Sequence, residues 1–326
     1  MVVSSDLMPE AGVDYPATWQ QFDEWFPDEL AARRFFEALR WPDGFACPKC
    51  ASVDAWETGK GKWMCRQCGR QTSVTSGTVM DRTRTPLKTW LAAIWFVCSQ
   101  KNGMSAKALQ QVLGFKSYET AWSMMHKLRR SMIHAGQLPL GGPGVSVEID
   151  ETVIGGRSKG MSGPRMLNKS RVVVAIERQH PKGLGRVRMQ SISGQIRDDV
   201  LDFAGNNIAD GSIVYTDGAS HYNDLTKTIS VTHEQISMVH AKDPAHIMLP
   251  AVHRVASLLK RWLAGTLHHG QSLENIDFYL NEFTFRFNRR TSHSRGLLFY
   301  RLCDNVVSTR PHPLETLKIT NREDFS

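Results

Sequence analysis

Val147-Glu148-Ile149-Asp150-Glu151-Thr152 is an apolar run that ends in carboxylates, and the rest of the chain is arranged around it. A buried strand with acidic groups is unfavourable unless a cation binds there, because an unpaired buried charge is strongly disfavoured. The run Ser212-Ile213-Val214-Tyr215-Thr216-Asp217-Gly218 has a similar arrangement, with one carboxylate before a glycine turn. Two strands that each end in Asp predict one shared site, with a metal ion as its simplest partner.

The 326 residues suffice for two or three modules with a full core, and 41% of them are hydrophobic, as in ordinary globular proteins. No run approaches the roughly 18 apolar residues that a membrane helix needs. The N-terminus also lacks the basic and apolar regions of a secretion signal. We therefore expect a cytoplasmic protein without a membrane partner.

The net charge of +8 is spread unevenly along the chain. Residues 1–43 hold 3 basic and 9 acidic residues, residues 44–145 hold 14 and 4, and residues 146–326 hold 23 and 19. A concentrated basic segment is typical of nucleic-acid-binding modules, since phosphate neutralisation supplies most non-specific affinity. Ribosomal proteins can show the same asymmetry.

Four of the six cysteines form two Cys-x-x-Cys pairs, Cys47 with Cys50 and Cys65 with Cys68. Two such turns present four thiolates to one tetrahedral site and leave no open position for chemistry, so the spacing predicts a zinc ribbon over residues 44–82 with structural Zn²⁺. Redox-active or coincidental cysteines are the alternative. Cys98 and Cys303 stand alone in apolar surroundings.

Helical periodicity covers much of the first 136 residues. Residues 18–40 predict two short helices divided at Pro27, within an N-terminal helical segment 1–43. Thr85-Pro86 predicts the start of a longer helix. Two shorter patterns follow, Ser105 to Leu113 and Ser117 to about Met132, joined by Gly114-Phe115-Lys116.

This pair of helices has the layout of a helix-turn-helix, which predicts a DNA-binding module over residues 83–136. On its second helix, His126, Lys127, Arg129 and Arg130 fall largely outside the apolar stripe, so we expect the two arginines and the lysine to contact DNA. An ordinary helical hairpin with a solvated basic face is the alternative.

Residues 137–145 are rich in Pro and Gly and predict a linker, after which the pattern changes to strands. Three strands in succession, then helix, strand, helix, strand and helix predict an α/β domain with a mixed five-stranded sheet. In such sheets the functional residues lie at the ends of strands. Neighbouring carboxylates such as Asp150 and Asp217 require Mg²⁺ or Mn²⁺ between them to stay ionised. Paired metal ions are the standard apparatus for attack on phosphodiesters.

A later helix offers two further candidates. His253 lies 36 positions after Asp217, and Lys260 follows two helical turns on, so His253 and Lys260 share one helix face with Ser257. His253 would be a third metal ligand and Lys260 a phosphate contact. The alternatives are a histidine that only caps or packs and an ordinary surface lysine. Along the strand, alternation directs Glu151 away from Asp150 and places Glu148 on the same face.

The chain resembles the ISXO-like insertion-sequence transposases. The resemblance rests on the two cysteine pairs, Glu-Ile-Asp150-Glu-Thr-Val-Ile-Gly-Gly, Tyr-Thr-Asp217-Gly, Pro250-Ala-Val-His253, Leu-Lys260-Arg-Trp and Asn281-Glu-Phe-Thr-Phe-Arg-Phe-Asn-Arg-Arg290. It implies a ribonuclease-H-like catalytic domain of the DDE superfamily, which we place at 146–300, followed by a tail at 301–326. Asp150 and Asp217 would be the first two acids. His253 and Lys260 stand where many relatives have Glu with Lys or Arg, as in an Asp-Asp-His-Lys variant.

The resemblance implies a nucleoid-associated enzyme that binds double-stranded DNA at element ends and at the target. It would hydrolyse one strand, join the 3′-hydroxyl to target DNA, and act as a homo-oligomer on DNA. Two other functions remain open: a catalytically inactive zinc-ribbon regulator that only binds DNA, and a structure-specific metal-dependent nuclease that cuts without joining.

Overall fold

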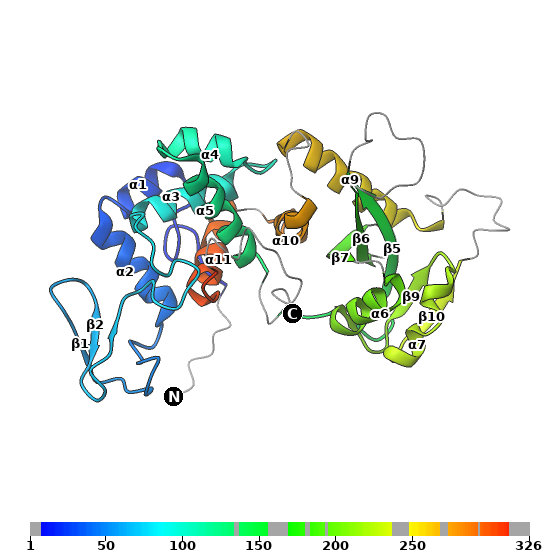
Figure 1. Ribbon diagram of the computed structural model, residues 1–326, viewed down its shortest axis with the longest axis horizontal. Coiled ribbons are helices and arrows are strands. Elements are labelled where there is room, and N and C mark those ends of the chain that lie inside the picture. The colour runs from blue at the N-terminus through cyan, green and yellow to red at the C-terminus, as the bar shows by residue number, and fades with distance from the viewer. Residues whose placement is uncertain are drawn as a thin grey trace. The chain divides into compact units, whose positions relative to one another are not determined.

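The computed structural model describes residues 8–133, 137–155, 169–179, 183–192, 195–236, 248–267, 273–292 and 294–312. The chain forms two compact units, the first made of residues 1–134 and 291–321 and the second of residues 135–290 and 322–326. Figure 1 labels their helices and strands. In the described segments, no helix combines the length and apolar character needed to cross a bilayer.

The first unit begins with the two short helices that the sequence predicts, α1 (Trp19–Trp25) and α2 (Glu29–Arg40). The side chains of Thr18 and Asp28 cap them by accepting hydrogen bonds from backbone N–H groups of the first turns. A small antiparallel sheet follows, of β1 (Ala55–Glu57), β2 (Trp63–Cys65) and β3 (Gln71–Thr72). It contains the predicted hairpin through Trp56 and Trp63.

Three helices complete the N-terminal part of this unit: α3 (Leu87–Ser99), α4 (Ala106–Leu113) and α5 (Tyr118–Ser131). Helix α4 ends at Gly114, whose φ of 67° is a left-handed conformation that favours glycine, and α4 packs against α5. The predicted pair of helices with a short turn is therefore present.

The C-terminal helix α11 (Arg295–Ser308) belongs to this first unit, where it packs against α2, α3 and α5. Rings of α1, α3 and α11 meet there, with the Phe299 ring centroid 5.4 Å from that of Trp95 and 5.9 Å from that of Phe22. The predicted domain end at residue 300 and the tail from 301 are therefore wrong, because this apolar helix completes the first core. Residues 313–326 lie outside the described part.

The second unit contains the predicted mixed five-stranded sheet, in the order β10-β9-β5-β6-β7. Strands β5, β6 and β7 are antiparallel neighbours, whereas β9 runs parallel to β5 and to β10. The strands are β5 (Ser146–Ile154), β6 (Ser170–Arg178), β7 (Leu184–Ile192), β9 (Ile213–Thr216) and β10 (Thr232–Gln235). A two-stranded sheet of β4 (Leu140–Gly141) and β8 (Ile208–Ala209) lies partly within the segment predicted as a linker.

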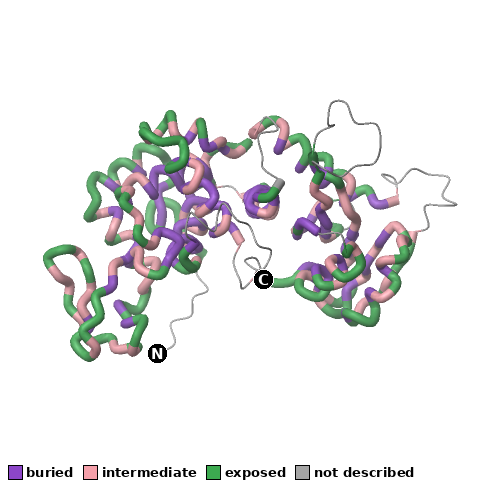
Figure 2. The backbone as a smooth tube through the Cα atoms, viewed as in Figure 1, coloured by how far each residue is buried: buried purple, intermediate pink, exposed green. Residues whose placement is uncertain are grey.

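Helices cover both faces of this sheet. On one face α9 (Pro250–Leu267) and α10 (Ile276–Asn288) bury side chains such as Val174 and Leu259. On the other face α6 (Ile196–Asn207) and α7 (Leu225–Thr228) bury side chains such as Val147 and Phe203. Short 3-10 turns, η1 (Ser220–Tyr222) and η2 (Leu273–Asn275), precede α7 and α10. Figure 2 shows buried positions along the strands and along the inner helices of the first unit.

Candidate functional site

The strand register brings the two predicted aspartates to the same end of two neighbouring inner strands, β5 and β9. Strands β5 and β9 are parallel, with Val147 paired to Val214 and Glu148 paired to Tyr215. Continuing this register by two residues places Asp150 level with Asp217, on the same face of the sheet because side chains alternate along a strand. The shared site predicted from the two acidic strands thus has a geometric basis.

The carboxylate of Asp150 lies in a partly buried and electrostatically unfavourable position. Burial, together with the nearby carboxylates of Glu151, Asp217 and Glu148, raises the pKa of Asp150 to about 7, against a hydrogen bond from the Glu151 N–H that lowers it. A cation at this position would offset both effects, because it stabilises the ionised carboxylate. This environment fits a divalent ion with oxygen ligands, such as Mg²⁺ or Mn²⁺.

His253 is the third predicted residue, and the structure brings it next to Asp150. Its Nε2 lies 3.6 Å from Asp150 Oδ2, and its side chain is half-buried in the second turn of α9. The apolar stripe predicted for this helix is confirmed, since Val252, Leu259 and Leu263 pack against the sheet. The His253 ring thus lies beside a partly buried carboxylate.

The remaining residues of the predicted set are less closely gathered. Asp217 Oδ1 accepts a 2.9 Å hydrogen bond from the Ala219 N–H, which orders the turn after β9. Lys260 is exposed, on the helix face that also carries His253. Within the described residues, Asp150, Asp217 and His253 do not converge to within 4.8 Å of one another as the cysteines do.

Glu148 anchors the helix that carries His253. Its side chain is fully buried, and its Oε2 accepts hydrogen bonds of 2.8 and 2.9 Å from the N–H groups of Ala251 and Val252 in the first turn of α9. Its Oε1 lies 3.3 Å from Arg178 Nε. Burial raises the pKa of Glu148, against these hydrogen bonds and the charge of Arg178. The sequence predicts that Glu148 lies on the face of Asp150 and supports the site, and the structure adds that it accepts hydrogen bonds from the first turn of α9.

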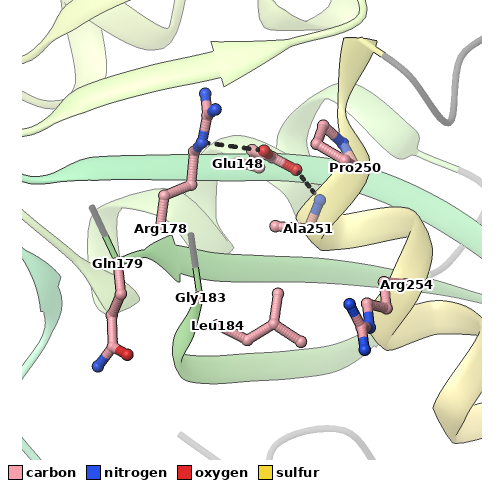
Figure 3. A pocket seen from close by; sticks show the side chains of 8 residues that line it. All are labelled: Glu148, Arg178, Gln179, Gly183, Leu184, Pro250, Ala251 and Arg254. Atoms are coloured by element: carbon pink, nitrogen blue, oxygen red, sulfur yellow. Dashed lines mark hydrogen bonds and ion pairs between the residues drawn. The ribbon is translucent and has the colours of Figure 1, made fainter. Parts of the chain in front are cut away.

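A cavity of about 290 Å³ opens beside this anchor. Figure 3 shows Glu148 between Arg178 and the start of α9, with Arg254 on the next part of the helix. The Arg178 guanidinium also lies over the Tyr215 ring, 5.3 Å from its centroid. Two arginines thus border a hollow close to Asp150, and the sequence analysis identified neither of them.

Glu151 points to the opposite face, as strand alternation predicts. Its Oε1 accepts hydrogen bonds from the hydroxyl of Tyr222, at 2.5 Å, and contacts His221 Nε2 at 3.0 Å. Burial and the Glu151 carboxylate raise the pKa of the Tyr222 hydroxyl well above its usual value. These contacts tie the turn after Asp217 to strand β5.

The four paired cysteines form a compact cluster in the first unit. All four sulfur atoms lie within 4.8 Å of one another, with 3.5 Å between Cys47 and Cys68 and 3.6 Å between Cys50 and Cys65. Tetrahedral zinc with Zn–S bonds of about 2.3 Å requires S–S separations of about 3.8 Å, so the cluster fits the ion. Hydrogen bonds, that from the Lys49 N–H foremost, lower the pKa of the Cys47 thiol to about 6, whereas the pKa of the Cys50 thiol is raised, against the Ser52 N–H, by burial and the neighbouring thiols.

The basic residues predicted on α5 divide into two groups. Lys127 and Arg130 are partly exposed, but Arg129 is only 1% exposed and His126 is fully buried. The expectation that Arg129 points outward to DNA is therefore wrong. Helix α5 packs against α11 as well as α4, so more of its surface is buried than the helix pair alone predicts.

Comparison with known proteins finds a match to a part of each unit. Residues 27–71 match the family described as the transposase zinc-ribbon domain, and residues 139–288 match the ISXO2-like transposase domain. The chain is also 25% identical over 285 residues to an uncharacterized protein in transposable element ISH50 of Halobacterium salinarum, an alignment that covers 80% of this chain and 91% of that protein. The second match, residues 139–288, lies within the main segment of the second unit, residues 135–290.

Proposed function

Since this chain carries the zinc-ribbon and ISXO2-like domains of insertion-sequence transposases, we propose that it cleaves the ends of an insertion sequence and joins them to target DNA. The first unit would bind the element ends, through the ribbon and a helix-turn-helix formed by α4 and α5. The second unit would be a ribonuclease-H-like catalytic domain. The observation that carries the proposal is the partly buried Asp150 carboxylate with His253 Nε2 3.6 Å away, inside the matched transposase domain.

We assign metal-binding roles to Asp150, Asp217 and His253. Divalent ions held there would activate the attacking oxygen and stabilise the leaving oxygen of a phosphodiester. Asp150 and Asp217 offer carboxylate oxygens from neighbouring strands, and His253 offers an imidazole nitrogen from α9. The raised pKa of Asp150 supports this role, because the ionised form gains most from a bound cation.

The other residues of the site would hold DNA and the metal ligands in place. Lys260 lies two helical turns beyond His253 on the same face, from which its ammonium can reach a phosphate of the bound strand. Glu148 fixes the first turn of α9 and thereby the distance from His253 to Asp150. Water and then a DNA 3′-hydroxyl would act as successive nucleophiles, so no covalent protein–DNA intermediate is required.

The decisive experiment uses the purified full chain with a labelled duplex that ends in the terminal sequence of its own element. With Mg²⁺ or Mn²⁺ and target DNA, we expect strand cleavage at the end and joined products. Asp150→Asn and Asp217→Asn should each abolish both while the duplex is still bound. Joining by either variant would refute the site.

The same assay separates the two other functions. A DNA-binding regulator would bind the duplex without cleaving it under any metal condition. A structure-specific nuclease would cleave branched substrates but would give no joined product. The cross-linked size of the protein on DNA tests the expected homo-oligomer.

A further inference from the structure

A second cavity lies in the first unit, well separated in sequence from the acidic site. It has a volume of about 380 Å³ and lies between the segment that follows the zinc ribbon and one face of α5. The segment contributes Arg82, Thr83, Arg84 and Thr85, α3 contributes Trp90, and α5 contributes Glu119, Thr120, Ser123, Met124 and Lys127. We call this cavity the basic notch.

The floor of the basic notch is formed by buried apolar side chains, and a hydrogen bond holds the neighbouring segment against it. Trp90 and Met124 are each only 2% exposed. The indole N–H of Trp90 donates a 3.0 Å hydrogen bond to the Thr83 hydroxyl, which also accepts one from the Thr85 N–H at 3.2 Å. Thr83 thus fastens the segment to α3, and the basic side chains on either side of it remain at the rim.

Three cations border the notch. Arg82 and Arg84 are exposed, and Lys127 is half-buried. In the described part of the chain, no carboxylate lies within 4.0 Å of any of these three cationic groups. Glu119 also lines the notch, and burial lowers the pKa of Lys127 against the charge of Asp81, which raises it.

The hydroxyl groups of the wall also fit an anionic occupant. Ser123 and Thr120 line the wall one and two helical turns before Lys127, and their hydroxyl groups can donate hydrogen bonds to phosphate oxygens. Arg82 has a φ of 55°, a left-handed conformation that is unfavourable for a residue other than Gly or Asn.

We propose that the basic notch binds a phosphate of the DNA backbone of the element end, held by Arg82, Arg84 and Lys127. This inference rests on the proposed function, because it takes the transposon end as the ligand. A concave site with point charges and hydroxyls accepts a phosphodiester but does not read base edges. The contact is therefore independent of base sequence and fixes the position of α5 on the duplex.

The test measures binding of the full, zinc-loaded chain to two labelled duplexes, the element end and a scrambled sequence, by fluorescence anisotropy at several salt concentrations. The variants are Arg84→Gln, Lys127→Gln and the double change. Arg82→Asn is included because Asn tolerates the left-handed backbone. Lys101→Gln is the matched control, since Lys101 is exposed in the same unit and does not line the notch.

Each single change should weaken binding to both duplexes by the same factor. It should also reduce the slope of log K against log salt by about 1, and the double change should reduce this slope by about 2. Lys127→Arg should restore the slope. A duplex with one neutral methylphosphonate in place of the contacted phosphate should lower wild-type affinity and leave the double variant unaffected.

Unchanged affinity and slope in all variants, with normal wild-type binding, would overturn the notch and leave the transposase proposal intact. A loss confined to the element-end duplex would also overturn it, because that pattern requires base readout. If the wild type does not cleave DNA but the salt dependence of binding changes in the variants as predicted, the proposed function is refuted and the phosphate contact stands. Zinc content and thermal melting of each variant establish that the fold is retained.

Discussion

The Glu148 carboxylate on β5 accepts a 2.8 Å hydrogen bond from the backbone N–H of Ala251, the second residue of α9. The same oxygen atom, Oε2, also accepts a 2.9 Å hydrogen bond from the Val252 N–H. First-turn N–H groups of a helix have no partner within the helix, and a carboxylate there also interacts favourably with the helix dipole. The site's strand and its ligand-bearing helix are therefore joined at one buried residue.

This contact predicts that Glu148→Ala impairs catalysis without removing a metal ligand. The substitution leaves two first-turn N–H groups without their acceptor, which should lower the free energy of unfolding by about 2 kcal/mol. It also frees α9 to shift, so His253 should lose its position beside Asp150. Unfolding in guanidinium and cleavage rates at a temperature where both proteins are folded measure the two effects.

Glu274→Gln serves as the control for this prediction, because Glu274 is exposed and precedes α10. Glu148→Gln should lie between wild type and Glu148→Ala, since it keeps one acceptor oxygen but loses the charge that faces Arg178. Full cleavage activity in Glu148→Ala would contradict the anchoring role.

The imidazole of His253 predicts a preference for Mn²⁺. Nitrogen ligands suit borderline metals better than Mg²⁺, which prefers oxygen. Wild-type cleavage should therefore be faster in Mn²⁺ than in Mg²⁺ at matched concentrations, and His253→Glu should shift the ratio of rates towards Mg²⁺. Rates are measured on the element-end duplex with each metal in turn. An identical metal ratio in both proteins would argue against direct ligation by His253.

The pKa of Asp150 predicts how stability depends on pH without added divalent metal. Its folded-state pKa of about 7 lies above the value of about 3.9 for an unperturbed Asp, so between these values the folded state binds more protons than the unfolded state. The contribution of Asp150 to the free energy of unfolding is therefore present at low pH and is lost as the pH rises through about 7.

Asp150→Asn removes this loss, because the amide stays neutral at every pH. Its melting temperature should match that of wild type near pH 4 and exceed it by several degrees at pH 8, where the ionised carboxylate costs a few kcal/mol at most. The melts are best run without added Mg²⁺ or Mn²⁺ and without chelator, so that zinc stays bound. A difference between the two proteins that is constant with pH would speak against the raised pKa.

The cysteine cluster predicts one structural zinc per chain. Cys68→Ser should lower the zinc content and unfold residues 44–82, because zinc binding supplies much of the folding free energy of such small modules, on the order of 10 kcal/mol. Metal analysis and binding to the element-end duplex record the effect. Cys98→Ala is the control, since Cys98 is buried in α3 and lies outside the cluster. Zinc content that is equal in the two variants would exclude the four-cysteine site.

Local signals were sufficient where the determining interactions are close in sequence. The division of the first two helices at Pro27, the turn at Gly114 and the two Cys-x-x-Cys pairs each depend on residues a few positions apart. The start of α3 shows the opposite case. The sequence predicts Thr85 as its cap, but the Glu29 carboxylate of α2 accepts the N–H groups of Leu87 and Lys88 at 2.7 and 3.1 Å.

Helix α11 shows the same limit on a larger scale. Its apolar residues are visible in the sequence, but nothing local indicates that they pack with helices more than 150 residues earlier. The misplaced boundary at residue 300 and the misjudged exposure of Arg129 both relate to this one long-range association.

By itself, the sequence determined the zinc ligands, the mixed five-stranded sheet and the candidates Asp150, Asp217 and His253, because alternation, helical period and ligand spacing are properties of the chain alone. Only the tertiary structure decided that His253 lies beside Asp150, that Glu148 holds α9 in place, and that Arg82, Arg84 and Lys127 border one cavity. Each of these arrangements joins elements distant in the chain, and packing rather than local propensity sets the distances between them.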